Sequence, residues 1–270
     1  RRTLTAPTIF QFAKAMRYQT HLFDGGARQL RFGFDFDDLK AIDDWGTRDR
    51  FGNDTETDFR IAREVARLLE SPRGQFIVVL KRGNHVPYEE NYPPARSTWT
   101  PDGWRWQPSD PEESIFVNSY DNAIRYNVDA FLQVLLGGTS DPSRTVLLYT
   151  SDHGQQLTDA RPPGLDRHLI WGEVAVPLLM MGAVPPVDTG YAASHANIMA
   201  TLLDVMLVPE GGRPEGYATS LLRARASQRD PRPVFSGAFF GRGSFLVQDF
   251  DQLAREHAER MAGVQPRRSP

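Results

Sequence analysis

The chain contains no cysteine in its 270 residues. This absence excludes a disulfide framework, a thiolate metal site and a cysteine nucleophile, and it is compatible with a reducing or an oxidising compartment. The formal net charge of −3 gives no reason to expect nucleic-acid binding. No apolar run approaches the roughly 18 residues that a membrane helix requires, and no signal-like segment opens the chain.

At 40% hydrophobic content the chain can bury a full core, either as one large α/β domain or as two small domains. It opens without an initiator methionine and moves almost directly into a helical pattern. We therefore expect a fragment or an excised domain whose native form continues upstream.

Apolar runs alternate with helical patterns along the chain. The continuous apolar runs at 75–81 and 145–150 are typical of strands buried on both faces of a parallel sheet. The segment 174–182 is expected to be a third such strand, and 20–25 a shorter one. Helices are predicted at 7–16 (with Pro7 in the first turn), 54–71 (capped by Asp54 or Thr55), 114–138 and 194–206. The C-terminal part is expected to hold a hairpin within 233–249 and a polar helix at 251–262.

Strands that alternate with helices predict an α/β fold with a mostly parallel central sheet and helices on both faces. We expect strands 75–81 and 145–150 to share that sheet, with the hairpin as an antiparallel extension or edge. Residues 1–250 are assigned to one catalytic domain, and 251–270 to a terminal helix and tail. The Pro- and Trp-rich loop 92–111 is too long for an idle connection, and long ordered loops tend to be functional.

One apolar strand ends abruptly in an acid and an imidazole. Asp152 and His153 follow the run 145–150, and Gly154 allows the backbone to turn sharply. Ligands bind outside the carboxyl ends of strands in open parallel sheets, and a carboxylate beside a neutral imidazole suits zinc or a similar divalent ion. The dipeptide alone leaves a plain alternative, which is an Asp-capped turn with a surface histidine.

A second strand repeats this architecture. The run 75–81 is followed by a glycine and then by His85, in a loop rich in Pro and Tyr. His168 adds a third imidazole, on the loop that leaves the strand ending in Asp152 and His153. Strands that each deliver a histidine at their carboxyl ends can converge on one site.

Several ordered segments resemble a known family. The segments "TVLLYTSDHGQQL", "PTIFQFAKAMRYQTHLFDG", "KRGNHVPYEENYP", "NSYDNAIRYNVDAFLQVLL" and "SHANIMATLLDVM" resemble the sulfatase-like branch of the alkaline phosphatase superfamily, most of all the bacterial phosphoethanolamine and phosphoglycerol transferases. Together they cover roughly residues 6 to 207. The resemblance implies an alkaline phosphatase-like fold whose first strand is missing from this chain.

The resemblance also assigns roles to residues. It implies that Asp152 and His153 are ligands of a divalent metal, zinc first, with manganese or magnesium as alternatives. It implies that His85 and His168 contact the phosphoryl group or its leaving oxygen, to stabilise charge or donate a proton. The family's acidic ligand and nucleophilic Thr precede the matched region, so we assign neither Thr3 nor Thr5. We expect this chain alone to show little or no turnover.

The function implied is a metal-dependent transferase that moves a phosphoethanolamine or phosphoglycerol-type group from a phospholipid donor to a glycan or lipid acceptor. A Thr alkoxide would attack in line, and the acceptor would resolve the phospho-enzyme. The resemblance further implies an inner-membrane anchor upstream of this chain and a catalytic domain that faces the periplasm. The lack of cysteine departs from the disulfides common in phosphoethanolamine members. A sulfatase or phosphodiesterase, or a silent glycan- or lipid-binding module, stays open as an alternative.

The remaining candidates carry lower weight. Trp45 and Asp49, with Arg48 between them in the chain, could line a substrate pocket, as a Trp and a charged residue do in related phosphoglycerol transferases. Three tryptophans of the loop 92–111 could rim a lipid or glycan site, or pack on one another as a lid. The residues that we expect to be structural or solvated are His21, His195, His257 and the acids Asp35, Asp37, Asp38, Asp43 and Asp44.

Overall fold

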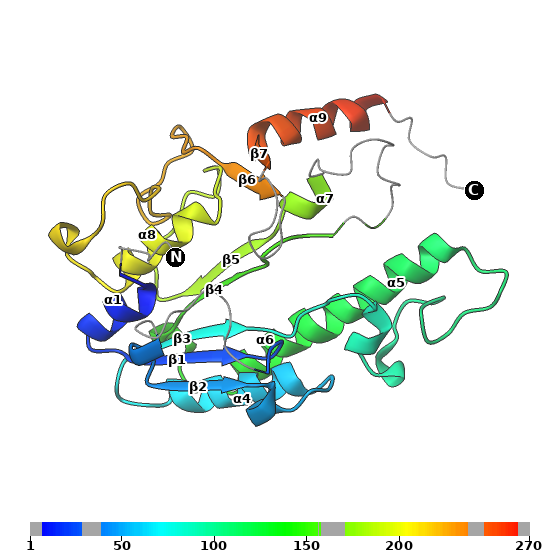
Figure 1. Cartoon of the computed structure of the whole chain (residues 1–270), viewed down its shortest axis with the longest axis horizontal. Coiled ribbons are helices and arrows are strands. Elements are labelled where there is room, and N and C mark those ends of the chain that lie inside the picture. The colour runs from blue at the N-terminus through cyan, green and yellow to red at the C-terminus, as the bar shows by residue number, and fades with distance from the viewer. Residues whose placement is uncertain (1–6, 29–38, 156, 158–170, 237–245, 264–270) are drawn as a thin grey trace. The chain divides into compact units, whose positions relative to one another are not determined.

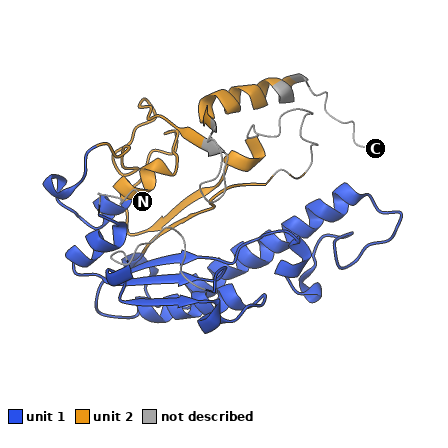
Figure 2. Cartoon of the chain, in the orientation of Figure 1, with its two compact units in different colours: residues 1–145, 202–215 blue, residues 146–201, 216–270 orange. Residues whose placement is uncertain are grey.

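The computed structural model describes residues 7–28, 39–155, 157, 171–236 and 246–263, and the account below is restricted to them. The chain divides into two compact units (Figure 2). Unit 1 comprises residues 1–145 and 202–215, and unit 2 comprises 146–201 and 216–270. Each unit is described by itself.

Unit 1 is built on a three-stranded parallel sheet (Figure 1). The central strand β1 (Gln19–Asp24) pairs with β2 (Asp44–Thr47) on one side and with β3 (Gln75–Leu80) on the other, both in parallel. Asp24 lies opposite both Thr47 and Leu80 in the pairing. The three strands therefore end at one edge, and the segments that follow them leave from that edge.

The helices of unit 1 pack mainly through apolar faces. Helix α4 (Thr57–Leu69) buries Phe59, Ala62, Val65 and Ala66, as its predicted apolar face requires. Its N-cap is Glu56, whereas Asp54 accepts the Glu56 N–H one turn earlier, so the predicted cap at Asp54 or Thr55 is displaced. The other helical segments are α1 (Ile9–Ala15), α3 (Arg48–Phe51), α5 (Glu112–Ile124), α6 (Ala130–Gly137) and the short turns η1 (Tyr88–Asn91), η2 (Pro94–Arg96), η4 (Pro142–Arg144) and η5 (Glu210–Gly212).

The long helix predicted at 114–138 is interrupted. Between α5 and α6 lies a π-helical turn, η3 (Arg125–Asp129), and Gly138 then caps the end of α6. A π-turn carries one residue more than an α-helical turn, so the side chains after it are rotated relative to those before it.

Unit 2 contains two antiparallel strand pairs. Strand β4 (Val146–Thr150) pairs with β5 (Leu178–Gly182), and β6 (Pro233–Ser236) pairs with β7 (Leu246–Asp249). The helices are α7 (Trp171–Val174), α8 (Ala196–Val205), which runs from unit 2 into unit 1, and α9 (Phe250–Gly263).

The α/β class with a parallel sheet is confirmed, and so is the C-terminal hairpin. Three details were wrong. Among the described strands, β3 and β4 belong to separate sheets, β4 and β5 run antiparallel, and β6 and β7 form a sheet of their own instead of extending the parallel one. The apolar runs located these strands, but the residues of β4 are only half-buried, and composition carries no information about the direction of a neighbouring strand. Within the described residues, no helix is long and apolar enough to cross a membrane.

Candidate functional site

The pair Asp152–His153 stands directly after β4 in unit 2. Asp152 Oδ1 accepts the His153 backbone N–H at 3.0 Å, which leaves Oδ2 to point elsewhere. The His153 Nδ1 lies 2.8 Å from the Gly154 carbonyl oxygen. A carbonyl can only accept, so Nδ1 carries the proton and Nε2 presents a lone pair. Metal-binding histidines are commonly oriented in this way by a carbonyl on the other ring nitrogen.

The two remaining atoms fit one metal ion. Asp152 Oδ2 and His153 Nε2 are 3.9 Å apart, and the side chains are 89% and 66% exposed, so both can rotate toward a shared ligand. Two atoms that each lie about 2 Å from one zinc ion can be at most about 4 Å apart. Nowhere in the described part of the chain, this turn included, do three His, Asp or Glu side chains gather as a group that could hold a metal, so Asp152 and His153 are a pair of candidate ligands.

Gly154 is required by close packing. Its N–H donates to the Glu173 carbonyl at 2.8 Å, and a Cβ at position 154 would lie only 2.2 Å from the Gly172 carbonyl oxygen. Any side chain here would force α7 away from the turn. We expected Gly154 to allow a sharp turn without a side chain in the way, and the structure gives the specific contact that a side chain would meet.

A third polar group meets the end of β4. His195, just before α8, places Nε2 3.2 Å from the Thr150 hydroxyl. That hydroxyl also lies 2.9 Å from the Pro177 carbonyl, to which it donates its one proton. His195 Nε2 must then donate to Thr150. We expected His195 to be structural. Its contact with Thr150, two positions before Asp152, was not visible in the sequence because it depends on how the start of α8 meets the end of β4.

His85 stands in unit 1, on the loop that leaves β3. Its side chain is exposed, and Nδ1 donates to the Val86 carbonyl at 3.0 Å. As in His153, the nitrogen left for chemistry is Nε2. The backbone carbonyl of His85 accepts from the buried Asn91 side chain at 2.5 Å.

The start of this loop is held by the buried side chain of Asp58. Asp58, 2% exposed, accepts the backbone N–H groups of Arg82 (2.8 Å) and Gly83 (3.4 Å). Burial raises the pKa of Asp58, and the nearby Lys81 ammonium opposes that rise. Burial lowers the pKa of Lys81 to about 8, against the pull of Asp58.

The other predicted site residues are distributed as follows. Trp45 lies on the edge strand β2 and is 52% exposed, and Asp49 lies in α3 immediately after that strand. Both belong to unit 1 with His85, whereas Asp152 and His153 belong to unit 2. His168 lies outside the described residues. The predicted convergence of His85 and His168 on Asp152 and His153 remains a prediction.

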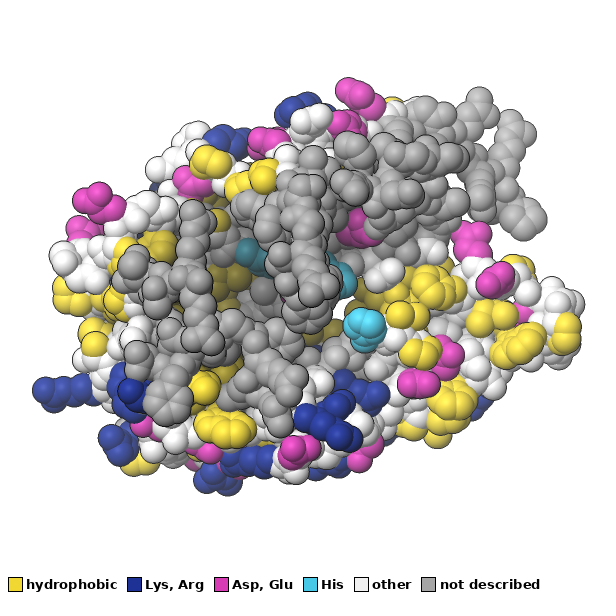
Figure 3. Space-filling view, viewed as in Figure 1, with side chains coloured by type: hydrophobic (Ala, Val, Ile, Leu, Met, Phe, Trp, Pro, Cys, Tyr) yellow, Lys and Arg dark blue, Asp and Glu magenta, His cyan; other side chains and the backbone are white. Residues whose placement is uncertain are grey.

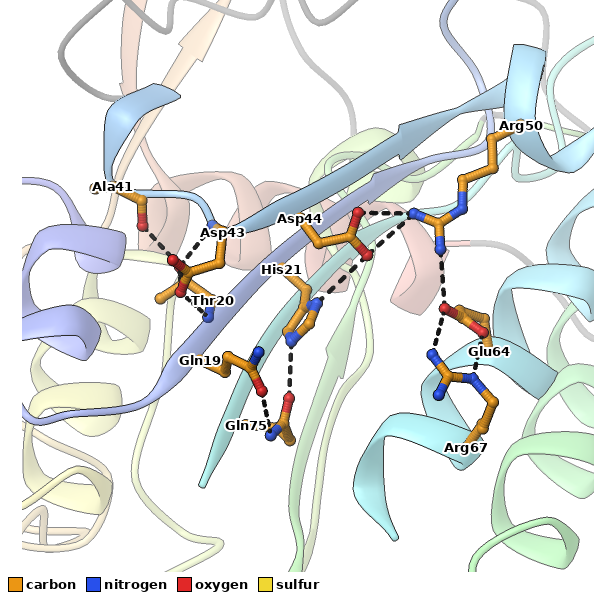
Figure 4. A network of polar contacts seen from close by, with 10 residues as sticks. All are labelled: Gln19, Thr20, His21, Ala41, Asp43, Asp44, Arg50, Glu64, Arg67 and Gln75. Atoms are coloured by element: carbon orange, nitrogen blue, oxygen red, sulfur yellow. Dashed lines mark hydrogen bonds and ion pairs between the residues drawn. The ribbon is translucent and has the colours of Figure 1, made fainter. Parts of the chain in front are cut away.

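His21 belongs to a structural network (Figure 4). It is 2% exposed, its Nε2 meets Gln75 Oε1 at 2.7 Å, and its Nδ1 faces Asp44 Oδ2 at 3.7 Å. Arg50 bridges Asp44 to Glu64, which in turn pairs with Arg67. This chain of charges ties β1 and β2 to α4, which confirms that His21 is packed.

The remaining candidates partly differ from expectation. Asp43 pairs with Lys14 at 2.5 Å, and Asp44 with Arg50, so these two acids are engaged rather than simply solvated. Asp35, Asp37 and Asp38 lie outside the described residues. His257 stacks on Trp171 with ring centroids 5.5 Å apart, because α9 returns along α7.

The loop 92–111 is ordered around a buried carboxylate. Asp102, fully buried, accepts from the Tyr92 hydroxyl, the Asn122 amide and the N–H groups of Trp104 and Arg105, at 2.8–3.1 Å. Trp99, Trp104 and Trp106 remain 42–56% exposed. In Figure 3, hydrophobic side chains gather at the right of the view, over the region of α5 and its preceding loop.

Comparison with known proteins identifies the family. The sulfatase family model matches residues 1–208, and the chain belongs to this family of the alkaline phosphatase superfamily. The chain resembles the C-terminal periplasmic domain of EcEptC from Escherichia coli in complex with Zn, with a TM-score of 0.68 and 21% identity over 93% of this chain and 73% of that one.

Two further proteins are similar. The lipoteichoic acid synthase LtaP from Listeria monocytogenes matches with a TM-score of 0.57 and 12% identity over 97% of this chain and 74% of that one. Arylsulfatase K of Danio rerio is 30% identical over 135 residues, which are 47% of this chain and 25% of that protein. The chain thus spans about a quarter of the curated relative that it matches.

Proposed function

We propose that the protein is a metal-dependent transferase that moves a phosphoethanolamine or phosphoglycerol-type group from a phospholipid donor to a glycan or lipid acceptor of the cell envelope. The observation that carries the proposal is the pair at the end of β4, where Asp152 Oδ2 and His153 Nε2 lie 3.9 Å apart. The EcEptC domain, which binds Zn and is periplasmic, and the lipoteichoic acid synthase LtaP support the class, the metal and an envelope location.

We assign a role to each candidate site residue. Asp152 and His153 would hold a divalent ion, zinc first, and the ion when bound supplies positive charge to a phosphoryl oxygen. His85 offers Nε2 to the transferred group. Because Nδ1–H is already donated to Val86, His85 can donate from Nε2 only as the imidazolium, and accepts there when neutral. We assign to His168 a contact with the same transferred group. We assign to Trp45 and Asp49 contacts with the head group of the donor.

A second function has one specific observation in its favour. The match to arylsulfatase K makes a hydrolase, with water as the acceptor, the alternative. Transfer and hydrolysis both use the metal-binding pair and act on a tetrahedral anion, so these residues do not distinguish the two reactions. The reactions differ in the acceptor, which is a glycan or lipid in one and water in the other.

Zinc binding tests the metal pair directly. Titration calorimetry of the 270-residue chain should show zinc binding that Asp152→Ala weakens by more than about 100-fold, since even groups around a ligand are worth about 10- to 100-fold. Asp188→Asn is the matched control, because Asp188 is also in unit 2 and bonds backbone N–H groups of Gly190 and Ala226. His85→Ala should bind zinc as the unmodified chain does. Equal affinity in Asp152→Ala would refute the metal assignment.

Turnover tests the reaction. The natural protein, with any sequence that precedes Arg1, should transfer label from phosphatidylethanolamine or phosphatidylglycerol to an envelope acceptor in the presence of zinc. His85→Ala should abolish transfer while it spares metal binding. Release of sulfate from an aryl sulfate, with no transfer from either lipid, would replace the transferase by the hydrolase. Zinc binding without either reaction would favour a silent binding module.

A further inference from the structure

The loop that carries His85 is closed by a single side-chain amide. Asn127 Nδ2 lies 2.8 Å from Asn84 Oδ1 and 2.8 Å from the Asn91 backbone oxygen. Asn84 directly precedes His85, and Asn91 lies at the end of the same loop. One amide group therefore ties the beginning of the loop to its end.

The orientation of this amide is unambiguous. The Asn91 backbone oxygen can only accept, so the nitrogen of Asn127 faces it, and both amide protons are used. Asn127 is 4% exposed, so water cannot readily replace either bond. An aspartate at this position would have almost the same shape but would turn one carboxylate oxygen, which can only accept, toward these two acceptors.

A helical irregularity brings Asn127 to the loop. Asn127 lies in the π-turn η3, and its backbone oxygen accepts from the Lys81 ammonium, which also lies 4.2 Å from the Phe131 ring centroid. The extra residue of a π-turn shifts the following side chains by about 100° around the helix axis. Such turns often occur at functional sites. Here the turn places both an amide and a carbonyl against the segment that leaves β3.

Further contacts fix the backbone of the rest of the loop. Gly83 has a φ of 72°, a left-handed conformation that favours glycine, and the chain bends there just before Asn84. The Asn91 side chain, in a residue 4% exposed, donates to the carbonyls of His85 (2.5 Å) and Pro87 (3.1 Å). The backbone of His85 is thus fixed from both sides, while its ring stays exposed.

We propose that Asn127 is a positioning residue for His85, acting through Asn84 and Asn91, and that the π-turn exists in this chain to deliver it. This inference rests on the proposed role of His85 toward the transferred group. Satisfied polar networks select one arrangement more strictly than apolar packing does, because any shift leaves a buried donor unpaired. An exposed catalytic imidazole on a loop needs that kind of support.

The histidine ring signals of the 270-residue chain provide a test that does not depend on activity. Its six histidines give six ring Cε1–H signals, and His85→Gln identifies the His85 signal by its loss. Asn127→Asp and the milder Asn127→Ser, whose one short hydroxyl cannot span both acceptors, should each shift or broaden the His85 signal. The signals of His153 and His195 should not move.

Asn122→Asp is the matched control. Asn122 is 1% exposed on α5, and its Nδ2 also donates to two acceptors, the Trp99 carbonyl and Asp102. It anchors the tryptophan loop instead of the His85 loop. Asn122→Asp should lower the melting temperature about as much as Asn127→Asp and leave the His85 signal unchanged. An unchanged His85 signal in Asn127→Ser, or an equal change in Asn122→Asp, would overturn the positioning role.

Turnover of the natural protein separates this inference from the proposed function. Asn127→Ser should reduce kcat by about 10- to 100-fold, as expected for a misplaced catalytic group, with KM changed by less than about 3-fold. Full activity of His85→Gln would refute the role of His85 and leave the ring signals to decide the positioning. Loss of activity in His85→Gln with normal kcat in Asn127→Ser would refute the inference alone.

Discussion

Lys81 should make unit 1 more stable as the pH rises from neutrality. Its ammonium lies beneath the Asn127 carbonyl and the Phe131 ring, and burial lowers its pKa from 10.5 to about 8. Between these two values the unfolded chain binds a proton at Lys81 that the folded chain does not. Stability therefore increases with pH across this window, and the gain is lost as the pH falls through the folded pKa.

The size of the effect follows from the two pKa values. With 10.5 for the unfolded chain and about 8 for the folded one, linkage gives a gain of about 2 kcal/mol between about pH 7 and about pH 9.5. The upper limit of about pH 9.5 lies below the range in which the tyrosines titrate. The pKa values of Tyr88, Tyr92 and Tyr126 are raised from 10.0 to about 12, mainly by burial, so their contribution is lost only as the pH rises above 10.

Urea unfolding followed by tryptophan fluorescence measures this gain. Four of the five tryptophans lie in unit 1, and Trp171→Phe removes the one in unit 2, so the signal then reports unit 1. The midpoint should rise by about 1 M urea between the two pH values, since about 2 kcal/mol is divided by a slope of about 2 kcal/mol/M. Lys81→Met, of similar length and uncharged, should remove the rise. A rise of the same size in Lys81→Met would show that another group causes it.

Two further predictions concern the loop 92–111 and the end of β4. Asp102→Ala should lower the unfolding free energy by about 3 kcal/mol, because it leaves Tyr92, Asn122 and two backbone N–H groups without their acceptor. The shift of the urea midpoint measures this loss, and a change below about 1 kcal/mol would contradict the prediction. Thr150→Val should free the His195 ring and sharpen its Cε1–H signal in NMR spectra, with no effect on His85; an unmoved His195 signal would show that the contact does not form in solution.

Sequence patterns predicted the elements with a clear apolar run or apolar face, and they missed those that depend on tertiary pairing. Apolar runs located β3 and β4, and helical spacing located α4. Strand β2 was missed because its residues, Asp44 to Thr47, include an aspartate and a glycine, which are poor strand formers. It forms because it pairs in parallel with β1 along its whole length. The direction of β5 relative to β4 and the π-turn at Asn127 also leave no pattern in composition.

In the candidate site, too, the sequence predicted which residues matter but not which of their atoms are available. The sequence pointed to His85 and His153 because each follows an apolar strand, but it could not show which ring nitrogen each presents. In both, Nδ1–H is donated to a carbonyl of the next residue, Val86 or Gly154, and Nε2 is left for chemistry.

His195 differs, because Thr150 already engages its Nε2. If His195 also contacts a substrate, it must do so through Nδ1. His195 was the weaker candidate because of its place in the sequence, and the hydrogen bond of its Nε2 to Thr150 also distinguishes it from His85 and His153. The choice between the two nitrogens depends on one backbone carbonyl or one hydroxyl nearby, which only the folded chain brings into place.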